Sequence, residues 1–343
     1  MNDNNLELKK AYRIRCDMDC ECRHYIFTPD SNILSKKEYS YTDSNRQLLK
    51  FASDVVGMVS DCYILYAVGY LGTCDKETMR AFLINMQTRY PELYIGDVSD
   101  ENAFSRRVHA LVAVGFLFVV RYNDAELGES APGMLPSRLY SLSQDAAVFM
   151  NQKLTKRVPY NKWVVAKPLN QLIGWAAAAF IGASLSGNKY HVSYLENVFR
   201  NRSLGSFFMP CAEKFFDGQD YYYVSFIDAF LIRDEKSQTE HDFAEFEVIK
   251  LNTIRNFVLA RTKNGIACVV IVVEDNKDLV AMAKLLLASG AMLDVIDHLY
   301  FTSEGAYRKA VYDKDAFLQM TVNEVGNDGA QFDFVAVQPP FLN

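Results

Sequence analysis

The sequence predicts a mixed α+β or α/β chain, in which an N-terminal winged helix-turn-helix is followed by a domain built on a mixed sheet. Residues 99–142 show the order helix, glycine, strand, polar loop and strand, which is the order of elements in a winged helix. From residue 219 onward, strand patterns alternate with helix patterns, which is typical of an α/β or α+β domain. Between these two regions, residues 151–165 form a basic connector that contains Pro159.

The composition of the 343 residues supports a division into two domains. Half of the residues are apolar and 13% are aromatic, which is enough for buried cores and excludes a largely disordered chain. The net charge of −6 is unevenly distributed, since residues 151–212 hold 8 basic side chains and 1 acidic side chain. The expected regions are an N-terminal arm over 1–45, the winged helix over 46–150, the connector over 151–165, a second domain over 166–320 and a tail over 321–343.

The helix predicted between residues 99 and 114 is the candidate reading helix. Ser99 and Asp100 can cap its N-terminus, and Gly115 is placed to end it as a C′ glycine. The apolar positions that share one face of this helix are Phe104, Val108, Leu111 and Val112. Its polar side chains suit the major groove of DNA, where arginine reads guanine. The candidate DNA-contacting residues of the helix, the two strands and the connector are Ser105, Arg106, Arg107, His109, Arg121, Arg138, Lys153, Lys156 and Arg157.

Two more helices are predicted in the same domain. The first runs from about Arg46 to Tyr70, and the second begins at a cap at Thr73 or Asp75 and ends before Pro91. Together with the candidate reading helix they supply the three-helix core that a winged helix needs. The alternative is a winged helix that contacts only proteins, because a fold alone does not determine a function.

A group of soft metal ligands lies in the N-terminal arm. Cys16, Cys20, Cys22 and His24 fall within nine residues, which raises the question of a zinc site. Structural zinc sites usually use paired C-x2–4-C units separated by a longer loop, whereas all four ligands here follow one another without such a loop. On a strand, Cys20, Cys22 and His24 share one face with Met18, so the spacing is equally consistent with a packed sheet.

The second domain is predicted to combine buried helices with strands. Residues 168–185 indicate a buried apolar helix, and residues 191–202 a short amphipathic helix or turn. The continuous apolar run 266–273 is typical of a strand that is covered on both faces. The other expected elements are strands at 221–233, 241–249 and 299–302, and helices at 250–263 and 275–290.

Three carboxylates lie within the predicted strands of this domain. Asp228 lies in one strand, and Glu245 and Glu247 lie in the next. In metal-dependent nucleases, an aspartate and an E-x-K pair on adjacent strands hold Mg²⁺ and position water. Glu247 stands where the lysine is expected, and Lys250 follows three residues later. The pattern therefore fits an active nuclease, a degenerate nuclease-like site or the polar face of a half-exposed strand.

Four segments, taken in order, resemble the replication-relaxation proteins of bacterial plasmids and conjugative elements. They are Arg-Leu-Tyr-Ser-Leu-Ser at 138–143, the helix at 169–185, Phe-Ile-Asp-Ala-Phe-Leu-Ile at 226–232 and Phe-Ala-Glu-Phe-Glu at 243–247. The resemblance covers about residues 45–305. It implies a winged helix followed by a restriction-endonuclease-like domain, in which Glu245 and Glu247 match the family's acid pair and the nuclease lysine is missing.

Three hypotheses about function follow. The first, which the resemblance favours, is a non-catalytic accessory DNA-binding protein of a mobile element, acting in plasmid replication, mobilisation or transfer. The second is a nuclease that uses Asp228, Glu245 and Glu247 with Mg²⁺ or Mn²⁺, and only this hypothesis requires a cofactor. The third is a protein-interaction scaffold. The expected partners of the first are double-stranded DNA, a relaxase or other transfer proteins, and a second copy of the chain.

The expected location is the cytoplasm. The N-terminus is polar and charged, without the apolar segment of a signal peptide. The longest apolar run, 172–183, is too short to span a bilayer. Seven cysteines form no regular disulfide framework, which fits a reducing compartment.

Overall fold

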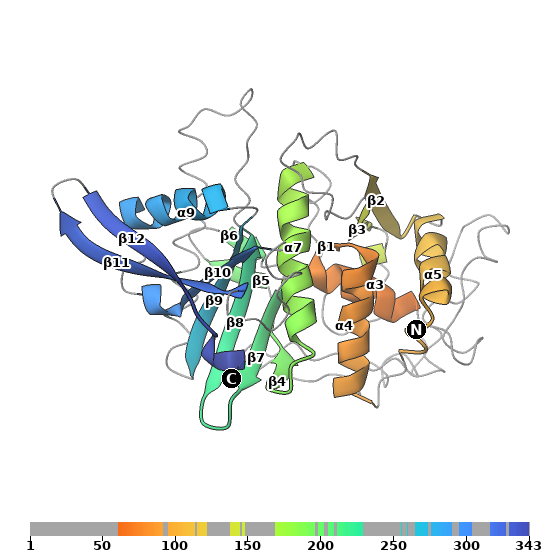
Figure 1. Cartoon of the computed structure of the whole chain (residues 1–343). Coiled ribbons are helices and arrows are strands. Elements are labelled where there is room, and N and C mark those ends of the chain that lie inside the picture. Colours follow the sequence, from red (N-terminus) through yellow and green to blue (C-terminus); the bar gives the residue numbers. More distant parts are fainter. Residues whose placement is uncertain are drawn as a thin grey trace. The chain divides into compact units, whose positions relative to one another are not determined.

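The computed structural model confirms a chain of mixed α and β structure (Figure 1). The chain divides into two compact units between Lys167 and Pro168, and each unit is described by itself. The residues described are 61–91, 95–113, 115–121, 138–144, 146–147, 169–195, 198–201, 205–208, 211–228, 255, 259, 265–273, 276–289, 295–303, 316–326 and 329–342. The predicted N-terminal arm over 1–45 and the connector over 151–165 lie outside them.

The described part of unit 1 contains three helices and a small sheet. Its elements are α3 (Asp61–Leu71), β1 (Thr73–Cys74), α4 (Lys76–Arg89), α5 (Glu101–Ala113), β2 (Leu117–Arg121) and β3 (Arg138–Leu142). The three strands are antiparallel in the order β1-β3-β2, with Thr73 opposite Ser141 and Leu117 opposite Leu142. The sequence did not predict β1, because a two-residue strand has too little periodicity to be recognised.

Local signals begin α4 and end α5 where the sequence predicts. Asp75 caps α4, since its Oδ1 accepts a hydrogen bond from the backbone N–H of Thr78 at 2.6 Å. Gly115 has a φ of 79°, and the N–H of Phe116 donates to the carbonyl of Leu111 at 2.9 Å. A left-handed residue followed by such a bond is the glycine C-cap expected at the end of α5.

The core of unit 1 is assembled around α3. All eleven residues of α3 are buried, which matches its almost wholly apolar sequence. Tyr70 at its end stacks on Phe82 of α4, with ring centroids 5.4 Å apart. Phe104 and Leu111 of α5 are also buried, at 1% and 0% exposure. Burial of these large side chains removes the most apolar surface from water and is the main source of stability for this unit.

Unit 2 is organised around a seven-stranded sheet. Its helices are α7 (Leu169–Leu185), α9 (Asn276–Ser289) and the short 3₁₀ helices η3 (Ile296–His298) and η5 (Pro340–Leu342). Its strands are β4 (His191–Tyr194), β5 (Val198–Asn201), β6 (Gly205–Phe208), β7 (Cys211–Phe216), β8 (Tyr221–Asp228), β9 (Ile266–Val273), β10 (Leu299–Ser303), β11 (Leu318–Gly326) and β12 (Gly329–Ala336). Strands β5 and β6 form a separate hairpin.

The seven strands lie in the order β12-β11-β10-β9-β8-β7-β4. The central strands β8, β9 and β10 are parallel, and the outer strands pair antiparallel. Strand β9 is buried along almost its whole length, as its continuous apolar sequence predicts. Val269 and Ile271 face the core that contains Met282 of α9, while α7 packs on the opposite face. Helices therefore cover both faces of the parallel part of the sheet.

Two predictions for unit 2 are wrong. The segment 191–202, expected as a helix or turn, contains β4 and β5, because pairing of His191–Tyr194 with β7 outweighs a weak helical pattern. The expected tail over 321–343 holds most of the β11–β12 hairpin, and the boundary at 320 falls inside β11. The register shift between Val322 and Val325 interrupts the alternation that would have revealed this hairpin.

Among the described residues, no helix is long and apolar enough to cross a membrane.

Gly182 allows α7 to approach the sheet closely. A Cβ atom at this position would lie 2.7 Å from both Cβ and Sγ of Cys211 and 3.0 Å from the ring of Phe226. We expect Gly182→Ala to lower the free energy of unfolding by about 1–3 kcal/mol, because overpacking outweighs the gain in helix propensity. Urea unfolding checks this, with Ser184→Ala on the same helix as the control that changes little. A variant as stable as the native chain would show that α7 can move away without cost.

Candidate nucleic-acid interface

The candidate reading helix α5 begins at a well-formed cap. The carboxylate of Asp100 accepts a hydrogen bond from the N–H of Ala103 at 3.0 Å. The carbonyl of the same residue accepts from the N–H of Phe104 at 2.9 Å. Glu101 lies in the first turn, where a negative charge interacts favourably with the helix dipole. Thus the predicted N-terminus of the helix is confirmed at Asp100.

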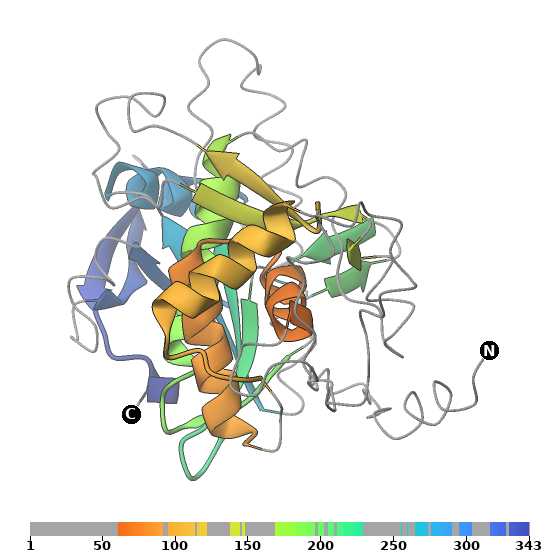
Figure 2. The same cartoon turned by 90° about the vertical axis from the view of Figure 1, so that its right-hand side faces the viewer.

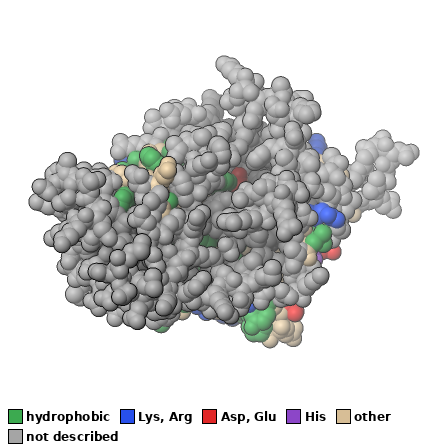
Figure 3. All heavy atoms as spheres, turned by 180° about the vertical axis from the view of Figure 1, so that it is seen from behind, with side chains coloured by type: hydrophobic (Ala, Val, Ile, Leu, Met, Phe, Trp, Pro, Cys, Tyr) green, Lys and Arg blue, Asp and Glu red, His purple; other side chains and the backbone are tan. Residues whose placement is uncertain are grey.

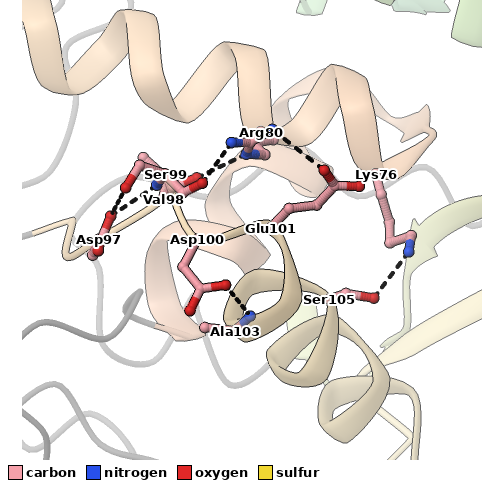
Figure 4. A network of polar contacts seen from close by, with 9 residues as sticks. All are labelled: Lys76, Arg80, Asp97, Val98, Ser99, Asp100, Glu101, Ala103 and Ser105. Atoms are coloured by element: carbon pink, nitrogen blue, oxygen red, sulfur yellow. Dashed lines mark hydrogen bonds and ion pairs between the residues drawn. The ribbon is translucent and has the colours of Figure 1, made fainter.

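A network of polar contacts holds the turn between α4 and α5 (Figure 4). Arg80 of α4 donates from Nε to the carbonyl of Val98 at 2.8 Å and from its guanidinium to the carbonyl of Ser99 at 2.7 Å. A carboxylate oxygen of Glu101 lies 4.0 Å from the same guanidinium. Asp97 accepts hydrogen bonds from the hydroxyl and the N–H of Ser99, and these bonds hold the pKa of Asp97 below its ordinary value. Arg80 therefore has a structural role in fixing this turn.

A second contact fixes α4 against the middle of α5. The Nζ of Lys76 donates to the hydroxyl of Ser105 at 2.9 Å. Ser105 is half-buried, so this predicted DNA contact has a structural role between the two helices. Figure 2 shows α5, in yellow-orange, running across the front of unit 1 next to β2 and β3.

The two faces of α5 differ as the periodicity predicts. Phe104, Val108 and Leu111 are buried, and Val112 is half-buried. On the outer face, the exposed residues are Glu101, Asn102, Arg106 and His109. Arg106 is therefore the arginine of α5 that can reach a ligand from this face.

Arg107 was predicted to contact DNA, and the structure contradicts this. Its side chain is only 4% exposed, and its guanidinium forms a two-pronged ion pair with the carboxylate of Asp61 in α3. The reason lies in the helical period: Arg107 is three residues after Phe104 and four before Leu111, so it shares their buried face. The positive charge of Arg107 favours a solvent-exposed position, but its place in the helical repeat puts the side chain on the buried face.

The β2–β3 hairpin follows α5 directly. Arg121 at the end of β2 lies opposite Arg138 at the start of β3, and Arg138 is exposed. Phe118 of β2 is 46% exposed, which adds an apolar group to the same hairpin. The loop 122–137 lies outside the described residues.

Of the three predicted carboxylates, only Asp228 lies within the described residues. Asp228 ends β8 and is buried, with Val272 of β9 as its neighbour in the register. Strands β7 and β9 pair with the two edges of Tyr222–Phe226, and the strand expected to carry Glu245 and Glu247 lies outside the described residues. The remaining predicted site residues that lie outside the described part are Cys16, Cys20, Cys22, His24, Lys153, Lys156, Arg157, Glu245, Glu247 and Lys250.

Among the residues that the structure describes, no three His, Cys, Asp or Glu side chains are arranged to hold a metal ion. A buried titratable group that the sequence analysis missed lies under α7 instead. Glu213 of β7 is fully buried, accepts a hydrogen bond from the thiol of Cys211 at 3.4 Å, and has its Oε2 3.9 Å from Nε2 of His191. Burial raises the pKa of Glu213 well above its ordinary value of 4.5. The available signal in the sequence was an acidic residue that shares one face of a strand with Cys211 and Phe215.

No family model matches the chain. No curated protein and no solved structure matches it either.

Proposed function

We propose that unit 1 is a winged helix that binds double-stranded DNA, with α5 in the major groove and the β2–β3 hairpin as the wing. The observation that carries the proposal is the order of elements: three helices, a short strand between the first two, and a hairpin after the third. The sheet order β1-β3-β2 fits this fold, because the short strand pairs with the returning strand of the hairpin. Such a module presents its third helix to DNA.

The side chains on the outer surface support a DNA contact of limited size. Arg106 and His109 lie on the exposed face of α5, and Arg138 is exposed on the hairpin. Asn102 lies one turn before Arg106 on the same face, and asparagine is the side chain that pairs with adenine in the major groove. The exposed carboxylate of Glu101 on this helix disfavours non-selective binding to phosphates.

The distribution of basic charge points in the same direction. The net charge of the chain is −6, and on the face seen in Figure 3 a few described Lys and Arg side chains are visible among residues that are not described. A protein that coats nucleic acid needs many phosphate contacts, since these supply most of the non-specific affinity. We therefore propose selective binding through few base contacts rather than coating of DNA.

The wider role that we propose is that of an accessory DNA-binding protein of a mobile element, without a catalytic site of its own. This role derives from the sequence resemblance to the replication-relaxation proteins. A restriction-endonuclease-like interpretation of unit 2 has support in its mixed sheet, with helices on both faces. The nuclease hypothesis has less support, because Glu247 stands in the sequence where the lysine of an E-x-K pair is expected.

We expect Arg106→Ala to weaken binding to a cognate duplex by about 5-fold to 100-fold, because one arginine–guanine contact contributes about 1–3 kcal/mol. The duplex is first selected by the full chain from a random-sequence library, and affinities are then measured by fluorescence anisotropy. Arg89→Ala is the matched control, because it removes the same charge from an exposed position on α4 and should bind like the native chain. If the full chain enriches no duplex, or if Arg106→Ala binds the selected duplex like the native chain, the proposal is wrong.

A further inference from the structure

A row of aromatic side chains runs across the strands β4, β7 and β8 of unit 2, at the end of the sheet where β8 begins. Phe216 of β7 lies opposite Tyr221 of β8, and their ring centroids are 4.6 Å apart. The N–H of Phe216 donates to the carbonyl of Tyr190 at 2.9 Å, which continues the register in which His191 lies opposite Phe215. Residues opposite each other in neighbouring strands share a face, so Tyr190, Phe216 and Tyr221 form one row.

The row is accessible rather than part of the core. Tyr221 is 43% exposed, and Phe216 and Tyr190 are half-buried. Gly265, which precedes the β9 partner of Tyr222, continues the row without a side chain. A Cβ atom at Gly265 would lie 2.5 Å from the carbonyl oxygen of Tyr221 and 2.9 Å from the ring of Tyr223. The absence of a side chain at Gly265 thus lets its backbone lie close to the backbone of Tyr221 and the ring of Tyr223.

Two lysines accompany the aromatic rings. The Nζ of Lys214 lies 4.4 Å from the ring centroid of Tyr221 and 5.5 Å from that of Tyr223. The Nζ of Lys189 lies 4.6 Å from the ring centroid of Tyr190, and Lys189 is exposed. Two cations are therefore held beside the outer rings of the row by contact with their faces.

We propose that this row binds single-stranded nucleic acid, with bases stacked on Tyr221 and Phe216 and phosphates near Lys214 and Lys189. Adjacent aromatic rings flanked by cations suit a ligand that carries both planar bases and phosphates. Stacking is tolerant of sequence because every base has a π-face, so the site needs no base-specific donors. The proposal is independent of the function proposed for α5, since it rests on other residues in the other unit.

The acidic groups nearby are compatible with this ligand. Asp217 lies in the turn between β7 and β8, where its Oδ1 accepts from the N–H groups of Gln219 and Asp220. Its Oδ2 accepts from the hydroxyl of Tyr222 at 2.8 Å. Tyr222 follows Tyr221 and so points to the opposite face of the sheet. Asp217 and Asp220 are the two described carboxylates of this turn, and Asp220 is the exposed one.

The test uses the full chain and a fluorescein-labelled oligothymidylate of about twelve nucleotides, a length that fits known single-strand sites. We expect Tyr221→Ala to lower the affinity by about 5-fold to 100-fold and Tyr221→Phe to bind like the native chain, because stacking needs the ring and not the hydroxyl. Lys214→Ala should reduce the slope of log affinity against log salt by about 0.7, the value for one phosphate contact in a single strand.

Two controls separate this proposal from folding effects and from α5. Val335→Ala removes an equally exposed apolar side chain of unit 2 and should not change binding. Arg106→Ala should leave oligothymidylate binding unchanged, whereas Tyr221→Ala should leave binding of the selected duplex unchanged. An oligothymidylate with 5-iodouracil should crosslink to the peptide that contains Phe216 and Tyr221. Absence of binding by the native chain, or native affinity in a folded Tyr221→Ala variant, would overturn the proposal.

Discussion

Replacing Arg107 with methionine is expected to lower the free energy of unfolding of unit 1 by about 3–5 kcal/mol. Arg107 connects α5 to the first residue of α3, with Nε 2.9 Å from Oδ1 of Asp61. Both side chains are buried, with exposures of 4% and 1%. Removal of the guanidinium leaves the Asp61 carboxylate in the interior without its cation, and the desolvation cost of that charge is then uncompensated.

Urea unfolding of the full chain measures this effect, and Arg106→Met is the matched control. Arg106 is adjacent in sequence but exposed, so its replacement should change stability by no more than about 0.5 kcal/mol. The double variant Asp61→Leu/Arg107→Met should be less destabilised than the sum of the single variants, because an apolar pair leaves no charge to desolvate. Additive losses would show that the two residues stabilise unit 1 independently and would contradict the ion pair.

Local signals made most of unit 1 predictable. Asp75, Asp100 and Gly115 act through side chains and dihedral angles within a few residues, so their effects do not depend on the rest of the chain. The apolar stripe of α5 was likewise confirmed, because apolar residues at this spacing share one face only if the segment is a helix. Arg107 was misplaced because its chemistry was given more weight than its position in that same stripe.

The errors in unit 2 have a different physical origin. Pairing in a sheet joins residues that are far apart in the chain, such as Glu213 and Tyr194 or Leu318 and Phe301. No local pattern specifies these partners, so the strand in 191–194 and the β11–β12 hairpin were not recognised. The aromatic row was missed for the same reason, because Tyr190 and Phe216 meet only through the register of β4 and β7.

The buried carboxyl group of Glu213 should make the stability of unit 2 fall as the pH rises. Because burial raises its pKa well above 4.5, the folded chain holds a proton that the unfolded chain releases above that pH. The contribution of Glu213 to stability is therefore fully present below about pH 4.5 and is lost as the pH rises through the folded pKa. While the two states differ by one proton, the loss is about 1.4 kcal/mol per pH unit.

Glu213→Gln removes this titration and preserves the shape of the side chain. We expect the variant and the native chain to be about equally stable at acidic pH, and the variant to become the more stable one toward neutral pH, as measured by urea unfolding from about pH 4 to about pH 8. Among the residues that the structure describes, the titratable groups that face Glu213 are Cys211 on its own strand and His191 and Tyr194 on β4. If Glu213 were instead ionised and paired with a protonated His191, the sign would reverse: Glu213→Gln would then leave a buried imidazolium and destabilise the chain at neutral pH. In both cases the difference in free energy of unfolding between Glu213→Gln and the native chain should vary with pH. A difference that stays constant over this pH range would contradict both protonation states.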